Sequence, residues 1–169
     1  MPALPPLILS CLLDPEAAHF FNGLRKKHFP PEKNFLDAHL TLFHHLPGEP
    51  SLFSGIEELC SRQAVINLAV QEVVFIGKGV AYRIESPVLK QLHKSLQQQW
   101  KEWLTPQDKQ GLWPHVTVQN KVAPETARQL QKELAERFVA FETTARGLQL
   151  WEYLGGPWKP VKTFLFTAR

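Results

Sequence analysis

Residues 39–48 read HLTLFHHLPG and residues 113–122 read WPHVTVQNKV. Both stretches contain the same tetrapeptide, at 39–42 and at 115–118: a histidine, an apolar residue, a threonine and a second apolar residue. With serine or threonine allowed at the third position, a composition like that of this 169-residue chain gives about 0.1 such tetrapeptide by chance. Two copies therefore indicate a repeated unit rather than a coincidence.

Each tetrapeptide has the alternation of a half-buried β-strand. Successive side chains of a strand point to opposite faces, so His39 and Thr41 share one face while their apolar neighbours enter the core. His115 and Thr117 repeat this arrangement in the second copy. We expect each motif to present a polar pair from a rigid strand.

The elements around the two motifs follow the same order. Periodicity and turn residues predict helices that begin near residues 15, 54, 86 and 124, and strands at 7–13, 39–46, 65–76, 80–85, 115–122, 144–153 and 160–167. Helix, motif strand, helix and two strands then occur twice, which leaves the strand at 7–13 unmatched.

This pattern predicts an α+β fold. We expect a two-lobed, pseudo-symmetric duplication in which antiparallel sheets line a central cleft and the helices pack outside. No low-complexity linker divides the chain, so residues 1–169 should form a single domain of two intertwined lobes, with the motif strands at 39–46 and 115–122. A hydrophobic fraction of 44% suits one continuous core.

Composition narrows the class of protein further. A net charge of +3 tolerates an anionic ligand without predicting one, and the basic stretch 25–28 is typical of a solvated helix face. Cys11 and Cys60 are too few for a disulfide framework and lack the spacing of metal ligands, which predicts a reducing, cytoplasmic location. No apolar run approaches the roughly 20 residues that cross a bilayer, so we expect no membrane association.

The two motifs resemble those of the 2H phosphoesterase superfamily, which contains the 2′-5′ RNA ligase-like proteins and the 2′,3′-cyclic nucleotide phosphodiesterases. That superfamily is defined by two H-x-[ST]-x motifs. The resemblance implies a duplicated fold with a cleft between sheets and a catalytic set of His39, Thr41, His115 and Thr117. Proline often precedes the family histidine, as Pro114 does here, whereas Ala38 precedes the first motif.

By this resemblance the two histidines act on opposite sides of a phosphodiester, one as base and one as acid, with no metal and no cofactor. Imidazole suits both roles because its ordinary pKa lies near neutrality. The hydroxyl groups of Thr41 and Thr117 can donate hydrogen bonds to the non-bridging oxygens. Which histidine is the acid stays open at this point.

Strand alternation extends the predicted site. It places Phe43 and His45 on the face of the first motif histidine, and Gln119 and Lys121 on the face of the second. Lys121 could pair with phosphate and Phe43 could stack on a base. We therefore count Phe43, Gln119 and Lys121 as candidate substrate-binding residues.

The sequence thus predicts a metal-independent, monomeric phosphodiesterase that acts on 2′,3′-cyclic phosphates or 2′-5′-linked RNA or nucleotides. Its partner would be an RNA end or a small nucleotide. One alternative is a binding module for RNA ends or nucleotides that lacks turnover. Another is a metal-dependent hydrolase whose ligands come from a cluster of histidines: His39, His44, His45 and His115.

Overall fold

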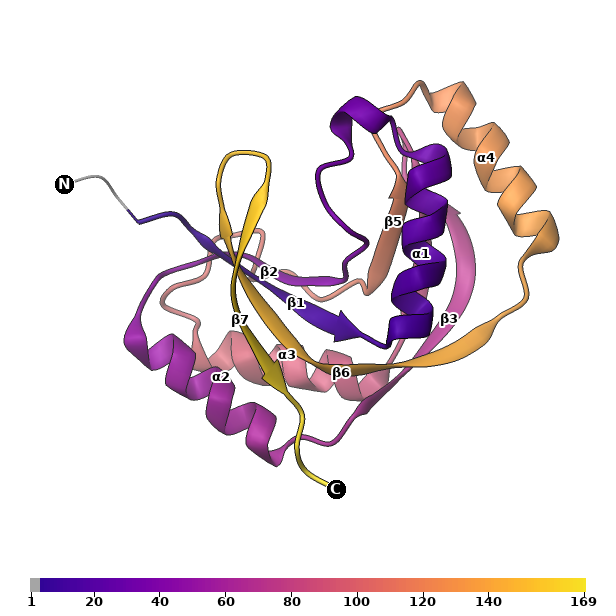
Figure 1. The fold of residues 1–169 in the computed structure, drawn as a ribbon. Coiled ribbons are helices and arrows are strands. Elements are labelled where there is room, and N and C mark those ends of the chain that lie inside the picture. Colours follow the sequence, from indigo (N-terminus) through magenta and orange to yellow (C-terminus); the bar gives the residue numbers. More distant parts are fainter. Residues whose placement is uncertain (1–3) are drawn as a thin grey trace.

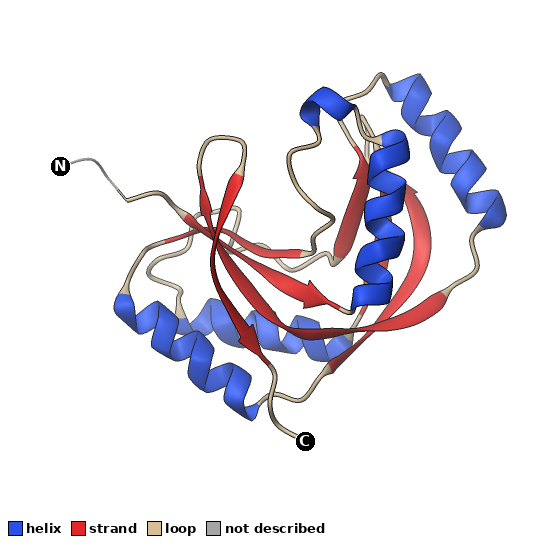
Figure 2. Ribbon diagram, in the orientation of Figure 1, coloured by secondary structure: helices blue, strands red, loops and turns tan. Residues whose placement is uncertain are grey.

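The computed structural model describes residues 4–169 (Figures 1 and 2). In chain order its elements are β1 (Leu7–Leu13), α1 (Pro15–His28), the 3-10 helix η1 (Pro31–Lys33), β2 (Thr41–Leu46), α2 (Pro50–Arg62), β3 (Ile66–Phe75), β4 (Val80–Glu85), α3 (Pro87–Gln99), β5 (His115–Gln119), α4 (Pro124–Arg137), β6 (Phe141–Tyr153) and β7 (Trp158–Leu165). No helix within residues 4–169 is both long and apolar enough to cross a membrane.

The strands form one antiparallel sheet in the order β2-β1-β6-β3-β4-β5, and β7 pairs with β6. The sheet curves until it is nearly closed, with the helices outside it (Figure 1). This confirms the predicted α+β class. The two sheets that the sequence predicted form one continuous sheet, because β3 pairs with β6 at its centre.

The strand order is symmetric about this junction. We call β2, β1 and β6 the first half-sheet, and β3, β4 and β5 the second half-sheet. The symmetry relates β1 to β4, β2 to β5 and β3 to β6, so the repeated unit is strand, helix, strand, helix, strand. The unmatched strand is therefore β7, and the expectation that the strand at 7–13 stands outside the repeat is wrong.

The two halves of the chain exchange helices. Helices α2 and α3 lie against the first half-sheet, whereas α1 and α4 lie beside the second (Figure 1). The guanidinium of Arg25 on α1 donates through Nη1 to the Thr117 carbonyl oxygen on β5, at 3.0 Å. In the same way, Nε2 of His93 on α3 donates to the Leu42 carbonyl oxygen on β2, at 3.0 Å. Each motif strand is thus held by a helix from the other half of the chain.

Every α-helix begins with a proline in its first turn, where the missing N–H costs nothing. Side chains cap two of them: Asp14 accepts from the Glu16 amide and Ser86 accepts from the Leu89 amide. Helix α2 begins at Pro50, earlier than the predicted start near residue 54, because this proline marks the start as in the other three helices.

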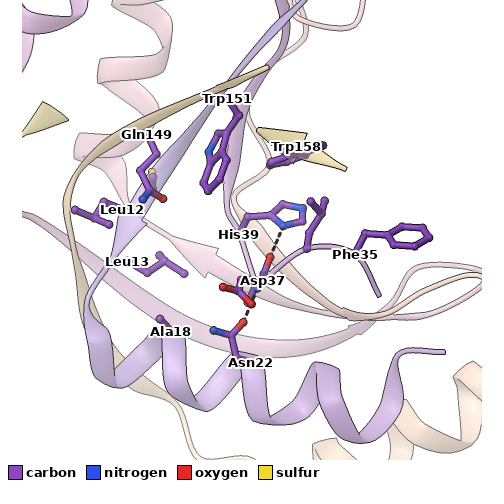
Figure 3. Close-up of a pocket in the computed structure, with 13 residues that line it drawn as sticks. Leu12, Leu13, Ala18, Asn22, Phe35, Asp37, His39, Gln149, Trp151 and Trp158 are labelled. Carbon is purple, nitrogen blue, oxygen red and sulfur yellow. Dashed lines mark hydrogen bonds between the residues drawn. The ribbon is translucent and has the colours of Figure 1, made fainter. Parts of the chain in front are cut away.

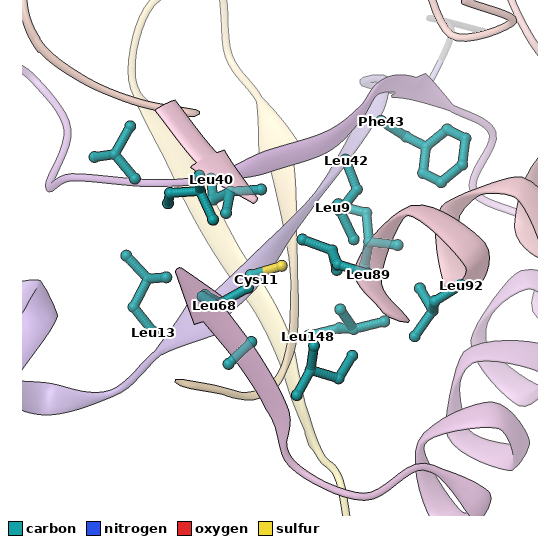
Figure 4. Close-up of a cluster of buried hydrophobic side chains, with 14 of the residues drawn as sticks. Leu9, Cys11, Leu13, Leu40, Leu42, Phe43, Leu68, Leu89, Leu92 and Leu148 are labelled. Atoms are coloured by element: carbon teal, nitrogen blue, oxygen red, sulfur yellow. The ribbon is translucent and has the colours of Figure 1, made fainter. Parts of the chain in front are cut away.

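The apolar members of both motifs enter one continuous core. Leu40, Leu42, Val116 and Val118 are all buried, at 2% exposure or less, and belong to one cluster of buried side chains. Figure 4 shows Leu40 and Leu42 among side chains from β1, α3 and β6. The neighbouring histidines and threonines remain partly exposed. The predicted alternation is confirmed over each tetrapeptide, so the core fixes the direction in which the polar pairs point.

The close pairing of β6 with β7 requires a glycine at position 147. A Cβ atom at this position would overlap the carbonyl oxygen of Phe164 on the adjacent strand. Because that contact is with backbone, Gly147→Ala should lower the free energy of unfolding by about 1–3 kcal/mol. Urea unfolding measures this change. Gly156→Ala, in the turn between the same strands with open space around it, is the control; equal midpoints for the two variants would contradict the prediction.

Candidate active site

The four motif residues come together in one cavity. His39 and Thr41 of the first motif and His115 and Thr117 of the second line a cleft of about 310 Å³. Residue 39 lies just before β2, and β5 begins at residue 115, so the two motifs lie on opposite edge strands of the same sheet. The curvature of the sheet brings these edges face to face.

Backbone carbonyls orient both imidazole rings in the same way. Nδ1 of His39 lies 2.8 Å from the Asp37 carbonyl oxygen, and Nδ1 of His115 lies 2.7 Å from the Trp113 carbonyl oxygen. A carbonyl oxygen only accepts, so each Nδ1 carries the proton of that bond. Nε2 of each ring is left without a protein partner among the described residues and is the atom available to a ligand.

The cleft favours the neutral form of both histidines. Burial lowers the pKa of His39 to about 4; the bond to Asp37 opposes this, and the positive charges of Arg25 and His115 add to it. Burial also lowers the pKa of His115 below its ordinary 6.5, against the effect of its own backbone bond. The two groups are thus displaced unequally, and His39 is the stronger candidate for a base at neutral pH.

A tryptophan covers each histidine. The ring of Trp158 lies 4.6 Å from that of His39, and the ring of Trp113 stacks on His115 at 4.3 Å between centroids. Figure 3 shows Trp158 beside His39, with Trp151 next to it. Sequence reasoning missed Trp158, which lies between the predicted strands at 144–153 and 160–167. These indoles remove the histidines from water and provide flat surfaces for a ligand.

A β-bulge follows each motif threonine. Along β2, Thr41 pairs with Ser10 whereas Phe43 pairs with Leu9, so one extra residue enters the strand. Along β5, Thr117 pairs with Ala81 and Gln119 with Val80, which again inserts one residue. The bulges reverse the alternation of side chains beyond the threonines.

The reversal corrects two predicted substrate contacts. Phe43 is fully buried, stacked on His93 at 4.6 Å, so the prediction that it faces the cleft is wrong. Gln119 is also buried, at 4% exposure, and lines none of the cavities beside the motifs. The residues that do face outward after the bulges are His44, in the cleft itself, and Asn120.

Two further cavities adjoin His39. One of about 390 Å³ contains Lys121, which was predicted to contact substrate, together with Lys33 and Asn120. The other, of about 380 Å³, contains Asn22, Asp37, Gln149 and Trp151 (Figure 3). A ligand held at His39 therefore has room to extend in either direction, and one of these directions is basic.

Arg25 departs from its predicted environment. The basic stretch 25–28 was interpreted as a solvated face, yet Arg25 is only 4% exposed and donates to Asn34, to the Leu36 carbonyl and to the Thr117 carbonyl. It holds the loop before the first motif against the second motif strand. Arg25 lies on the same face of α1 as the buried Phe21, so its side chain points into the protein.

The metal-dependent alternative requires that His39, His44, His45 and His115 lie close enough together to bind one metal ion. Among residues 4–169, no group of three or more His, Cys, Asp or Glu side chains is arranged to hold a metal ion. His44 lines the cleft, but His45 does not. The expected ligands are therefore not gathered at one point.

Known structures share this fold. TT0787 of Thermus thermophilus is similar in structure, with a TM-score of 0.69 and 16% identity over 97% of this chain and 99% of that one. E. coli LigT in complex with 3′-AMP gives a TM-score of 0.61 and 19% identity over 98% and 99%, and LigT in its apo form gives 0.62 and 18% over 99% and 100%. None of the curated proteins matches. The sequence model of the 2′-5′ RNA ligase superfamily matches residues 13–157, and the chain therefore belongs to this superfamily of 2H phosphoesterases.

Proposed function

We propose that the protein is a metal-independent phosphodiesterase that opens 2′,3′-cyclic phosphates, or cleaves 2′-5′-linked diesters, at RNA ends or on small nucleotides. One observation carries the proposal. Two edge strands present His39 and His115 to a single cleft, each with Nδ1 bound to a carbonyl and Nε2 available. This is the arrangement that acid–base catalysis on the two sides of a phosphodiester requires.

In the proposed reaction Nε2 of His39 removes a proton from the attacking water. His115, protonated at Nε2, donates a proton to the leaving oxygen. The lower pKa of His39 supports this division of roles, because the base must be neutral where the acid is still charged. The hydroxyl groups of Thr41 and Thr117 donate to the two non-bridging oxygens as negative charge develops on them.

The surroundings of the cleft support a nucleotide as the substrate. Trp113 and Trp158 offer stacking surfaces at both ends, and Lys33 and Lys121 line the adjoining cavity. The related LigT forms a complex with 3′-AMP, a nucleoside monophosphate of the kind that opening of a 2′,3′-cyclic phosphate produces. A cleft without these aromatic and basic groups would hold such an anion poorly.

Removal of either histidine should abolish turnover. His39→Ala and His115→Ala are each expected to lower kcat for adenosine 2′,3′-cyclic phosphate by about 10²–10⁴-fold, since each removes one proton-transfer group. The assay is run with and without EDTA, which should make no difference. His19→Ala, an exposed histidine on α1 outside the cleft, should keep wild-type rates. Absence of wild-type turnover together with measurable nucleotide binding would favour the binding module.

A substrate with a good leaving group separates the two roles. p-Nitrophenolate departs without protonation, so a p-nitrophenyl phosphodiester needs the base but not the acid. His115→Ala should therefore retain this activity within about tenfold of the wild type, while His39→Ala should lose about 10²-fold or more. The opposite pattern in the release of p-nitrophenol would reverse the assignment of acid and base.

The pH dependence follows from the same two groups. His39 loses its proton above about pH 4, and His115 keeps its proton only below a pKa that lies under 6.5. The profile of kcat/KM should therefore be bell-shaped with its maximum on the acid side of pH 6.5. The maximum in kcat should lie at higher pH, because a bound phosphate anion raises both pKa values. A maximum of kcat/KM above about pH 7.5 would contradict this.

A further inference from the structure

A third histidine faces the cleft. The bulge in β2 places Leu42 and Phe43 both toward the core, so the next residue, His44, takes the position on the cleft side. Its side chain is 48% exposed and lines the same cavity as the motif residues. The proposed reaction gives no role to His44.

A buried carboxylate fixes the ring of His44. Asp108 is 2% exposed and accepts from the backbone amides of His44 and His45, both at 2.9 Å, and from Nδ1 of His44 at 3.1 Å. Burial alone would raise the pKa of Asp108, but these hydrogen bonds outweigh it and hold the pKa below its ordinary value. The carboxylate only accepts, so Nδ1 of His44 carries a proton and Nε2 is left for a ligand.

Asp108 gives His44 a negatively charged partner within hydrogen-bond distance, at 3.1 Å. The other charged or titratable groups around His44 are His93 on α3, whose Nε2 is occupied by the Leu42 carbonyl, and the two motif histidines. All three are favoured in the neutral form by their burial. His44 is thus the cleft histidine with a fixed negative partner, which suits it to bind an anion.

The scissile phosphate leaves no oxygen for His44. In the proposed reaction its two non-bridging oxygens are held by Thr41 and Thr117, and the attacking and leaving oxygens by His39 and His115. His44 lies one cleft-facing position beyond Thr41, roughly 7–10 Å along the strand. That offset suits a second phosphate on the same nucleotide.

We propose that His44, oriented by Asp108, binds a second phosphate of the substrate, the 5′-phosphate of the nucleotide whose 2′,3′-phosphate is opened. The inference rests on the proposed function. The preferred substrate class is then an oligonucleotide end, or a nucleotide that carries a 5′-phosphate, rather than a nucleoside cyclic phosphate with a free 5′-hydroxyl.

The test compares two product-like ligands by calorimetry, adenosine 3′-monophosphate and adenosine 3′,5′-bisphosphate. His44→Gln should weaken binding of the bisphosphate about 10-fold or more, the loss of one hydrogen bond to a charged group, and leave that of the monophosphate within about twofold. Asp108→Asn should show the same selective loss. His45→Gln removes a neighbouring histidine whose side chain does not line the cleft and should change neither affinity.

Turnover provides an independent measure. His44→Gln should lower kcat/KM about 10-fold more for the cyclic nucleotide with a 5′-phosphate, mainly through KM, than for the substrate with a 5′-hydroxyl. Equal losses on both ligands, no loss on either, or the same loss in His45→Gln would each overturn the inference. If the wild type turns over neither substrate, the proposed function fails, while selective weakening of the bisphosphate in His44→Gln would still support the phosphate site.

Discussion

The structure depends on how the two free edges of its sheet are held. Strands β2 and β5 have a neighbouring strand on one side only, and their outer carbonyls would otherwise face the cleft or the core unpaired. Arg25 and His93, both nearly fully buried, donate to the Thr117 and Leu42 carbonyls from helices of the opposite half. These two bonds tie each motif strand to the other half of the chain, and the separation of the two motif histidines across the cleft depends on them.

The bulges complete the site from these anchored edges. A regular strand would have continued the row of the motif with Phe43 and Gln119; the extra residue buries both and presents His44 and Asn120 instead. Asp108 accepts from the amides of His44 and His45, which lie between Phe43 and Leu46, where the pairing of β2 with β1 shifts register a second time. The Asp108 carboxylate therefore also orients the His44 side chain in the cleft. One buried group thus stabilises the irregular strand and positions a residue of the cleft.

Much of the fold could be predicted from sequence because its signals are local. Proline and capping residues mark the helices, and strict alternation within each tetrapeptide correctly separates His39 and Thr41 from Leu40 and Leu42. The bulges could not be predicted, because no local pattern in the sequence marks them. They appear only in the pairing of β2 with β1 and of β5 with β4. Trp158 and Arg25 were missed for the same reason: their positions follow from how remote elements meet.

The exchange of α1 and α3 also bears on how such a chain can arise. If the connection between β3 and β4 were cut, each half would keep the strand that carries its own motif but would leave the helix supporting it in the other half. The chain thus has the topology of a domain-swapped dimer of two such halves. Because the two halves are joined covalently, their sequences can differ, and in the proposed reaction the two motifs take different roles: His39 acts as the base and His115 as the acid.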